Sequence, residues 1–113
     1  MAETCSVEQL RRAIESGAAP VVLDVRSRRE FVAGHIPGAR HVPFWQAWFR
    51  PVPRPRRREP VVVYCGHGPR ARVAAFLLRL RGVPVALLTG HMARWRREHG
   101  AEARGEPVEP PSR

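Results

Sequence analysis

The sequence predicts a single domain of the α/β class, in which helices cover both faces of a mainly parallel sheet. Short apolar runs rich in Val and Leu alternate with segments of helical periodicity, as in strands joined by crossover helices. The runs at 20–23 and 61–64 are apolar throughout, which is typical of strands buried on both faces. The 113 residues suffice for one hydrophobic core and leave little room for a second.

The first helix and the first strand have clear sequence signals. Ser6 and Gln9 have the spacing of a capping box, in which a side-chain hydroxyl and an amide satisfy backbone N–H groups at a helix start. Apolar residues then recur at helical spacing, so we expect a helix over 7–16 that ends before Gly17. A buried strand is predicted over 20–23.

A second capping box follows the first strand. Ser27 and Glu30 predict a short helix that ends at Gly34. The segment 35–39 combines a Pro that fixes one φ angle with a Gly that permits positive φ, which is typical of a turn. A short strand is expected next, over 40–42.

The middle of the chain contains an aromatic segment and a proline-rich segment. Four aromatic residues crowd the segment 44–49, and we interpret this stripe as core packing rather than as a ligand site. Four prolines and four arginines occupy 51–60, which excludes a helix or a central strand there. This segment is predicted to be an exposed loop.

The second half continues the alternation of strands and helices. The run 61–64 predicts the clearest buried strand, and apolar spacing predicts a helix from about 70 to 82. A strand over 84–88 and a short helix around 92–95 complete a domain at 1–99. Because 100–113 is rich in Gly, Pro and charge, we expect a flexible tail that does not pack.

The composition is strongly basic. All 20 basic residues are Arg, and the formal net charge is +10. Guanidinium groups match oxyanions in bidentate geometry, so an anionic ligand is one interpretation, and GC-rich codon usage is the other. The basic loop lacks interleaved aromatic residues, so no specific nucleic-acid partner is expected.

Two observations bear on location and redox state. The N-terminus lacks a basic region followed by an apolar run, and no stretch approaches the roughly 20 apolar residues of a membrane span. We therefore expect a cytoplasmic protein with no membrane partner. Cys5 and Cys65 lie far apart in a chain without export signals, which favours a free or catalytic thiol over a structural disulfide.

The most informative segment follows the strand 61–64. It reads Cys65-Gly66-His67-Gly68-Pro69-Arg70 and connects a strand end to a helix start. Backbone N–H groups and the helix dipole make such a loop an anion site, and thiolate is the nearest anion. We predict Cys65 as a nucleophile that needs no general base, with an inert buried thiol as the alternative.

Several pieces of the chain, in this order, resemble the rhodanese family over about residues 4–99. They are Leu23-Asp24-Val25-Arg26, Glu30-Phe31, Gly34-His35-Ile36-Pro37-Gly38-Ala39, Val62-Val63-Tyr64-Cys65, Gly68, Arg70 and Trp95. The resemblance implies a three-layer α/β/α fold with a mainly parallel five-stranded sheet. It also implies a catalytic Cys65 that takes a sulfane sulfur from a donor such as thiosulfate and passes it to a thiol or cyanide, without a cofactor. The acceptor would then be a small molecule or another protein.

Other residues are also expected to belong to the site. The substrate-binding set would be Gly66, His67, Gly68, Pro69 and Arg70. The supporting set would be Asp24, Arg26, His35, Ala71 and His91. The chain departs from the family at Gly90-His91, where a Gly-Gly pair is common, so an imidazole is expected near the mouth of the site. His67 is expected either to contact substrate or to face solvent.

Two other functions remain open. A phosphatase or arsenate reductase of the same fold would have five residues between Cys and Arg, whereas this loop has four. It would also usually have His where Tyr64 stands, and an acidic loop residue to protonate a leaving alcohol. A non-catalytic interaction module would be expected to lack Cys65. No metal site is predicted, because the five histidines form no compact ligand motif (His35, His41, His67, His91 and His99).

Overall fold

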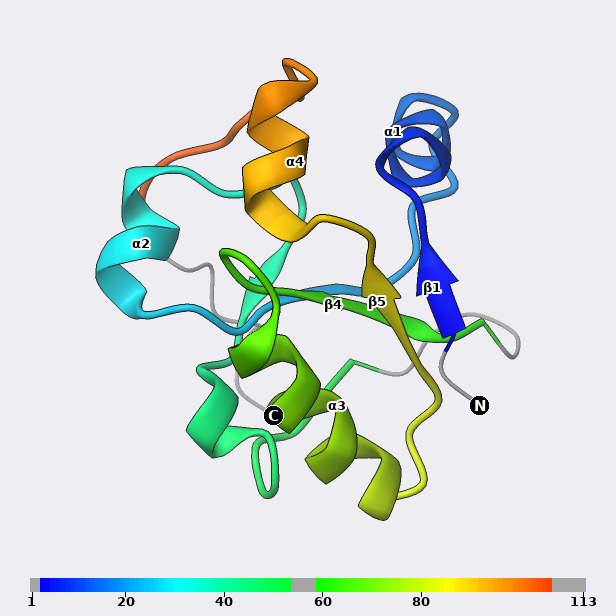
Figure 1. The fold of residues 1–113 in the computed structure, drawn as a ribbon, viewed down its shortest axis with the longest axis vertical. Helices are drawn as coiled ribbons and strands as arrows, with labels where there is room; N and C mark the ends of the chain where they lie inside the picture. The colour runs from blue at the N-terminus through cyan, green and yellow to red at the C-terminus, as the bar shows by residue number, and fades with distance from the viewer. Residues whose placement is uncertain (1–2, 54–58, 107–113) are drawn as a thin grey trace.

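A computed structural model describes residues 3–53 and 59–106 (Figure 1). Its five strands are β1 (Glu3–Cys5), β2 (Val22–Asp24), β3 (Arg40–His41), β4 (Val61–Tyr64) and β5 (Val85–Leu88). Its helices are α1 (Val7–Glu15), α2 (Arg28–Ala33), α3 (Pro69–Leu80) and α4 (His91–Arg97), with a 3₁₀ turn η1 (Phe44–Gln46). The predicted α/β/α fold with a five-stranded sheet is confirmed.

All the strand pairs are parallel, in the order β1-β5-β4-β2-β3. Strand β4 is central and pairs Val63 with Leu23 on one side and with Leu87 on the other. All four residues of β4 are buried, which explains its continuous apolar sequence. The carboxyl end of β4 therefore lies at the centre of the row of strand ends, and ligands of parallel sheets bind beyond the carboxyl ends of the strands.

Side chains alternate along β4 between two separate cores. Val61 and Val63 face the layer of α3 and η1, and Cys65 continues on that side. Val62 and Tyr64 face the layer that holds α1, α2 and α4. Figure 1 shows these layers on opposite sides of the sheet. Because side chains alternate along a strand, the single apolar run of β4 contributes to the cores on both faces of the sheet.

Most of the predicted elements form within one or two residues of their expected bounds. Both capping boxes are present, with the side chains of Ser6 and Ser27 accepting hydrogen bonds from the amides three residues later. The strand expected at 20–23 forms at Val22–Asp24, and that expected at 40–42 is only Arg40–His41. Strand β1 was not predicted, because Glu3–Cys5 is short and exposed on an edge and has no apolar pattern.

The expectation that the aromatic segment 44–49 packs in the core is wrong for three of its side chains. Trp45, Trp48 and Phe49 are 59%, 62% and 47% exposed. Only Ala47 is fully buried, and Phe44 is partly buried against the α3-side core. The segment forms a single 3₁₀ turn followed by hydrogen-bonded turns, so it presents no continuous helical face to the core.

The expectation that 100–113 does not pack is wrong for residues 100–106. Ala103 pairs with His35 through two backbone hydrogen bonds of 2.9 and 2.8 Å, and the Gly105 N–H donates to Val32. The indole N–H of Trp95 donates to the carbonyl of Ala101 at 2.7 Å. Backbone pairing, which composition does not encode, holds this segment. Residues 107–113, and 54–58 of the predicted exposed loop, lie outside the described residues.

Within the described ranges, no helix has the length and apolarity needed to cross a membrane.

Candidate functional site

The site is built on the loop between β4 and α3. Cys65 directly follows β4, and its side chain has no exposed surface. The N–H of Gly68 points back at it and donates a hydrogen bond to Sγ, with a nitrogen–sulfur distance of 3.0 Å. This contact places a backbone hydrogen-bond donor directly on the sulfur atom.

Glycine is required at position 68 by the backbone. Its φ of 139° is rarely adopted by residues with a side chain, and a Cβ there would lie 3.4 Å from Nε2 of His91. Pro69 follows at the first position of α3, where its missing N–H and fixed φ suit a helix start. This local sequence therefore curls the loop and begins the helix at the same point.

The start of α3 supplies further N–H groups. Its first helical backbone bond runs from Arg72 to the carbonyl of Gly68 at 3.0 Å. The preceding amides of Arg70 and Ala71 belong to the first turn, whose N–H groups have no intrahelical acceptors. They carry the positive end of the helix dipole beside the loop 65–70, here called the sulfur loop. An anion that extends from Cys65 would meet these donors.

Helix α4 also contacts this loop, through hydrogen bonds from its first turn. The amides of Met92 and Ala93 donate to the carbonyls of Cys65 and Gly66, at 2.9 and 3.2 Å. Gly90 and His91 both have positive φ, at 78° and 56°, and this bend directs the start of α4 at the loop. The sulfur loop is thus held between the N-terminal ends of two helices, an arrangement that the sequence alone did not reveal.

His91 contacts the loop through its ring. Nδ1 accepts the N–H of Cys65 at 3.3 Å, so the neutral ring carries its proton on Nε2. Burial, the largest cause, lowers the pKa of His91, and electrostatic interaction with Arg72 and His67 acts in the same direction. The imidazole expected at the mouth of the site is therefore present, as a neutral group that fixes the nucleophile's own amide.

Arg70 lies at the rim and is paired with a carboxylate that sequence reasoning treated as a helix cap. Its Nη1 and Nη2 lie 2.7 and 3.2 Å from the two carboxylate oxygens of Glu30. This pairing, the largest cause, lowers the pKa of Glu30 to about 2. Nη2 of Arg70 also lies 3.3 Å from where a Cβ on Gly66 would sit. Arg70 therefore spans the loop from its rim rather than projecting into its centre.

A buried polar network lies beneath the loop on the α2 side. Asp24 accepts hydrogen bonds from the backbone N–H and the guanidinium of Arg26, and from the Tyr64 hydroxyl at 2.7 Å. The same hydroxyl accepts the N–H of Ile36 at 3.0 Å, and Arg26 also donates to the carbonyl of Gly34. Asp24 and Arg26 form a structural pair, and Tyr64 is a third member that sequence reasoning had not placed there.

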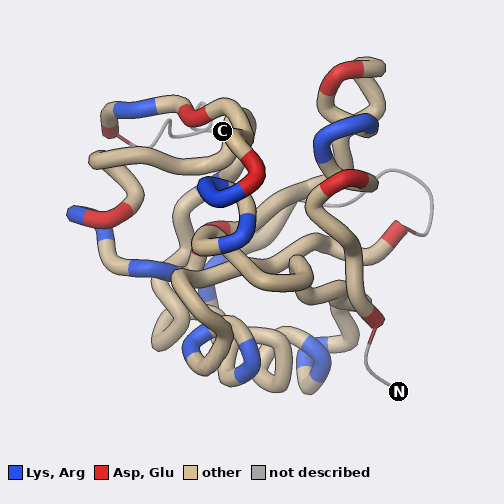
Figure 2. Tube along the Cα trace, turned by 45° about the horizontal axis from the view of Figure 1, so that its top comes forward, with Lys and Arg blue, Asp and Glu red and all other residues tan. Residues whose placement is uncertain are grey.

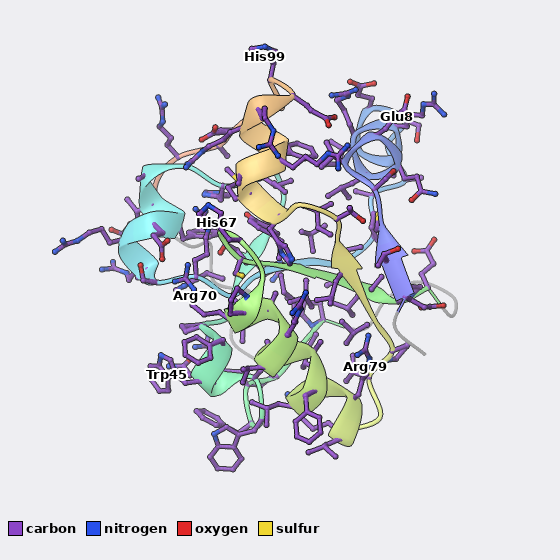
Figure 3. The ribbon with its side chains drawn as sticks, viewed as in Figure 1. Glu8, Trp45, His67, Arg70, Arg79 and His99 are labelled. Carbon is purple, nitrogen blue, oxygen red and sulfur yellow. The ribbon has the colours of Figure 1, made fainter. Side chains whose placement is uncertain are left out.

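The remaining predicted site residues separate into near and distant ones. Ala71 is fully buried in the first turn of α3, and His67 is exposed on the loop (Figure 3). His35 does not join them. Its ring stacks on Phe31 at a centroid separation of 3.7 Å and its Nδ1 lies 2.8 Å from the Phe31 carbonyl. His35 thus supports α2 and the 100–106 segment rather than the sulfur loop.

The sequence prediction did not assign Tyr64 or Glu30 to the site. Tyr64 alternates with Cys65 along β4, which puts its hydroxyl on the opposite face from sulfur. Glu30 was visible as a capping residue and as part of the Glu30-Phe31 piece that resembles the family, but its pairing with Arg70 joins positions 40 residues apart. The signal for Tyr64 is a hydrogen-bonding side chain on a fully buried strand. No local sequence pattern indicates the role of Glu30.

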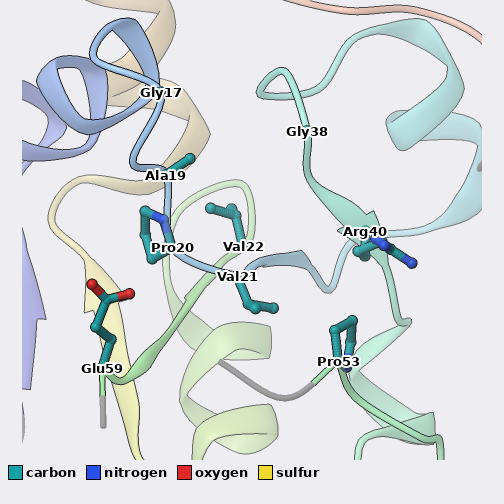
Figure 4. Close-up of a pocket in the computed structure, with 9 residues that line it drawn as sticks. All are labelled: Gly17, Ala19, Pro20, Val21, Val22, Gly38, Arg40, Pro53 and Glu59. Carbon is teal, nitrogen blue, oxygen red and sulfur yellow. The ribbon is translucent and has the colours of Figure 1, made fainter. Parts of the chain in front are cut away.

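A separate pocket of about 370 Å³ lies at the amino ends of the strands, at the opposite end from Cys65 (Figure 4). It is lined by residues that precede or begin β2, β3 and β4, among them Pro20, Arg40 and Glu59. Cys65 follows the carboxyl end of β4, so this pocket is not part of the sulfur loop. Among the described residues, no group of three or more His, Cys, Asp or Glu side chains is arranged to hold a metal ion.

Similar solved structures support the fold and include proteins with different described activities. A protein from Bacillus halodurans is 23% identical, with a TM-score of 0.78 over 91% of this chain and 77% of that one. A Rhodopseudomonas palustris protein of unknown function, described as a possible tyrosine phosphatase, is 28% identical, with a TM-score of 0.75 over 90% and 85%.

A thiosulfate sulfurtransferase from Pseudomonas aeruginosa is 29% identical, with a TM-score of 0.77. The match covers 91% of this chain but only 20% of that longer protein, so it compares one domain with a part of it. The family model of the rhodanese-like domain matches residues 6–98, from the cap of α1 to the end of α4. The chain therefore belongs to the family of rhodanese-like domains.

Proposed function

We propose that this protein is a sulfurtransferase that carries a sulfane sulfur as a persulfide on Cys65. The observation that carries the proposal is the N–H of Gly68 at 3.0 Å from Sγ, within a loop of four residues between Cys65 and Arg70. The amides of the first α3 turn lie beside it, so both a thiolate and a persulfide anion would be stabilised without a general base.

The reaction would proceed in two nucleophilic steps. The Cys65 thiolate attacks the outer sulfur of thiosulfate, the sulfur–sulfur bond of the donor breaks, and sulfite leaves with the electron pair. Cyanide or a thiolate then attacks the terminal sulfur of the persulfide, and the Cys65 thiolate leaves. Sulfur moves as a neutral atom and the enzyme returns to its first state, so no cofactor or external oxidant is needed.

Thiosulfate must pass between the backbone N–H groups of the loop to reach the buried sulfur of Cys65. Cys65 has no exposed surface, and Arg70 lies across Gly66 while paired with Glu30. This ion pair is partly exposed, at 34% and 39% of the two side chains, so little free energy opposes its exchange for another anion. We propose that thiosulfate draws Arg70 from Glu30 as it enters.

A phosphatase is the second candidate, because one similar structure is described as a possible tyrosine phosphatase. Three features favour sulfur transfer over phosphate ester hydrolysis. The loop has four residues rather than five between Cys65 and Arg70. Residues 66–69 include no carboxylic acid to protonate a leaving alcohol. Tyr64 stands where a histidine would be expected and is already committed to Asp24.

Mass spectrometry of the protein after thiosulfate treatment tests the proposal. We expect a gain of one sulfur atom on the peptide that contains Cys65, and its loss after cyanide is added. Cys65→Ser should neither gain sulfur nor form thiocyanate, whereas the matched variant Cys5→Ser should do both. Sulfur on Cys5 alone, or on neither cysteine, would contradict the proposal, and aryl phosphate hydrolysis by the parent would favour the phosphatase.

A further inference from the structure

One face of the molecule exposes several large apolar side chains close together. Six large side chains from η1, the residues after it and the outer side of α3 are between 46% and 69% exposed. They are Trp45, Trp48, Phe49, Val73, Phe76 and Leu80, here called the α3 aromatic face. Helix α3 packs on η1, and Figure 3 shows Trp45 projecting outward from η1 at the end of the molecule that α3 occupies.

The α3 aromatic face is ordered and large. Val73, Phe76 and Leu80 recur at helical spacing and so form one stripe along α3, and Trp48 packs edge-on against Phe49 at 4.8 Å. Aromatic side chains present about 150–250 Å² each, so the four half-exposed aromatic side chains offer roughly 350–600 Å² together, and Val73 and Leu80 add to this area. The exposed apolar area is therefore comparable with the largest patches of monomers, about 300–600 Å², and is roughly half or more of the about 800 Å² per partner of a standard interface.

The charge around this face has one sign. No Asp or Glu occurs in 31–58 or in 60–97, whereas Arg50, Arg72, Arg79 and Arg81 each stand next in sequence to one of the exposed side chains. Figure 2 shows basic but no acidic residues along α3. None of these four arginines forms an ion pair within residues 3–53 and 59–106. Arg81 instead donates to the carbonyl of Ala47 and ties the η1 segment to α3.

We propose that the α3 aromatic face is the docking surface for an acidic protein with an apolar surface patch, which receives the sulfur from Cys65. This inference rests on the proposed sulfur transfer. Trp, Phe and Arg are the residue types enriched in the buried centres of protein interfaces. The face begins at Val73, one helical turn after Arg70 on the same helix as the sulfur loop. A docked protein could therefore place a thiolate at the site.

The charge pattern distinguishes this partner from two others. A second copy of the chain would oppose arginine with arginine across a two-fold axis, with no carboxylate on the face to compensate. An anionic membrane would match the charge but offers no thiol to accept sulfur. An acidic protein satisfies the charge, the apolar surface and the chemistry together.

A binding experiment tests the docking independently of any sulfur chemistry. The probe is a synthetic amphipathic helix of about 20 residues, roughly 30 Å long, with Leu and Phe on one face and Glu on the other. A matched peptide has Lys in place of Glu. Trp45 and Trp48 are exposed whereas Trp95 is buried, so covering the face should shift the tryptophan emission to shorter wavelength. We expect binding of the acidic peptide only, weakened by salt.

Variants locate the binding surface. Trp48→Ala and Phe76→Ala remove exposed side chains, so the fold should persist, and each should weaken acidic-peptide binding by about tenfold or more. Arg79→Glu should do the same, whereas Arg12→Glu, which makes the same charge change on α1 in the other layer, should not. Thermal melts check that each variant is folded.

A transfer assay joins the face to the site. With a terminal Cys added, the acidic peptide should take sulfur from the Cys65 persulfide, and Trp48→Ala should slow this transfer about tenfold while leaving transfer to cyanide unchanged. Absence of a persulfide in the parent would overturn the proposed function and leave the fluorescence result standing by itself.

Three outcomes would overturn the docking proposal. One is tight binding to vesicles of phosphatidylcholine and phosphatidylserine without binding to the acidic peptide, which would assign the face to a membrane. Another is a dimer in sedimentation that Phe76→Ala converts to a monomer, which would assign the face to a second copy. The third is binding of the acidic peptide that Trp48→Ala, Phe76→Ala and Arg79→Glu all leave unchanged.

Discussion

Replacing Tyr64 by Phe should cost a large part of the stability of this domain. The hydroxyl donates to Asp24 at 2.7 Å and accepts the N–H of Ile36 at 3.0 Å, and all three residues are fully buried. Removing it leaves the Ile36 amide without its acceptor, which costs about 1–3 kcal/mol, and deletes a hydrogen bond to a carboxylate worth about 1.5–3 kcal/mol. The ring itself remains, so its apolar contacts persist.

Asp24 keeps its bonds from Arg26, which offsets part of this loss, so we expect a decrease of about 3 kcal/mol in the free energy of unfolding. For a domain of this size that lowers Tm by roughly 10–20 °C. Urea titration followed by circular dichroism measures the change. The matched control is Trp45→Phe, whose side chain is 59% exposed and whose replacement should change stability by about 0.5 kcal/mol or less.

The same substitution should alter the pH dependence of stability. Burial, followed by the charge of Asp24, raises the pKa of Tyr64 above its ordinary value. The unfolded chain therefore releases this proton near pH 10 while the folded chain retains it, so the stabilisation is complete below pH 10 and is lost as the pH rises beyond it. Tyr64 is the only tyrosine, so the difference between parent and variant should narrow above pH 10.

Two results would refute this reasoning. The first is a Tyr64→Phe protein within about 0.5 kcal/mol of the parent, which would mean that water or relaxed geometry replaces both bonds. The second is a pair of stability curves that stay parallel between about pH 9 and pH 11, which would mean that the phenol does not titrate differently in the two states.

Three further predictions concern the loop and the C-terminal segment. Arg70→Ala should slow the reaction of Cys65 with the anion thiosulfate more than its reaction with a neutral alkylating agent, because it removes a fixed positive charge from the rim; equal effects on both reactions would exclude this role. Inserting one Gly between Cys65 and Arg70 should weaken sulfur transfer and strengthen phosphate or arsenate binding, since a wider ring suits oxyanions; loss of transfer with no gain in oxyanion binding would refute this size argument. A chain ending at residue 99 should be less stable than one ending at 106 by about 2–4 kcal/mol in urea titration, because the indole of Trp95 and the backbone of His35 lose partners; equal stability would show that these contacts contribute nothing.

The sequence by itself determined the fold class and the place of the candidate nucleophile. Local signals were sufficient, because a capping box, an apolar run or a Gly-Pro helix start acts within a few residues of its own position. Both capping boxes formed as predicted at Ser6 and Ser27, and β4 formed at Val61–Tyr64. The order of these elements also implied a parallel sheet, since parallel strands need helical crossovers. Cys65 consequently had to lie at a strand end.

Tertiary structure decided whatever depends on residues distant in sequence. The Glu30–Arg70 pair, the bonds from α4 to the Cys65 loop and the pairing of Ala103 with His35 all join segments that no local pattern connects. Aromatic residues at 44–49 indicated apolar surface, but not whether it would be buried or exposed. Their burial depended on the space left around them in the fold. The face of the sheet that carries Val61 and Val63 is covered mainly by α3, so most of the aromatic side chains remain outside the core, because a side chain's burial is set by its neighbours and not by its own hydrophobicity.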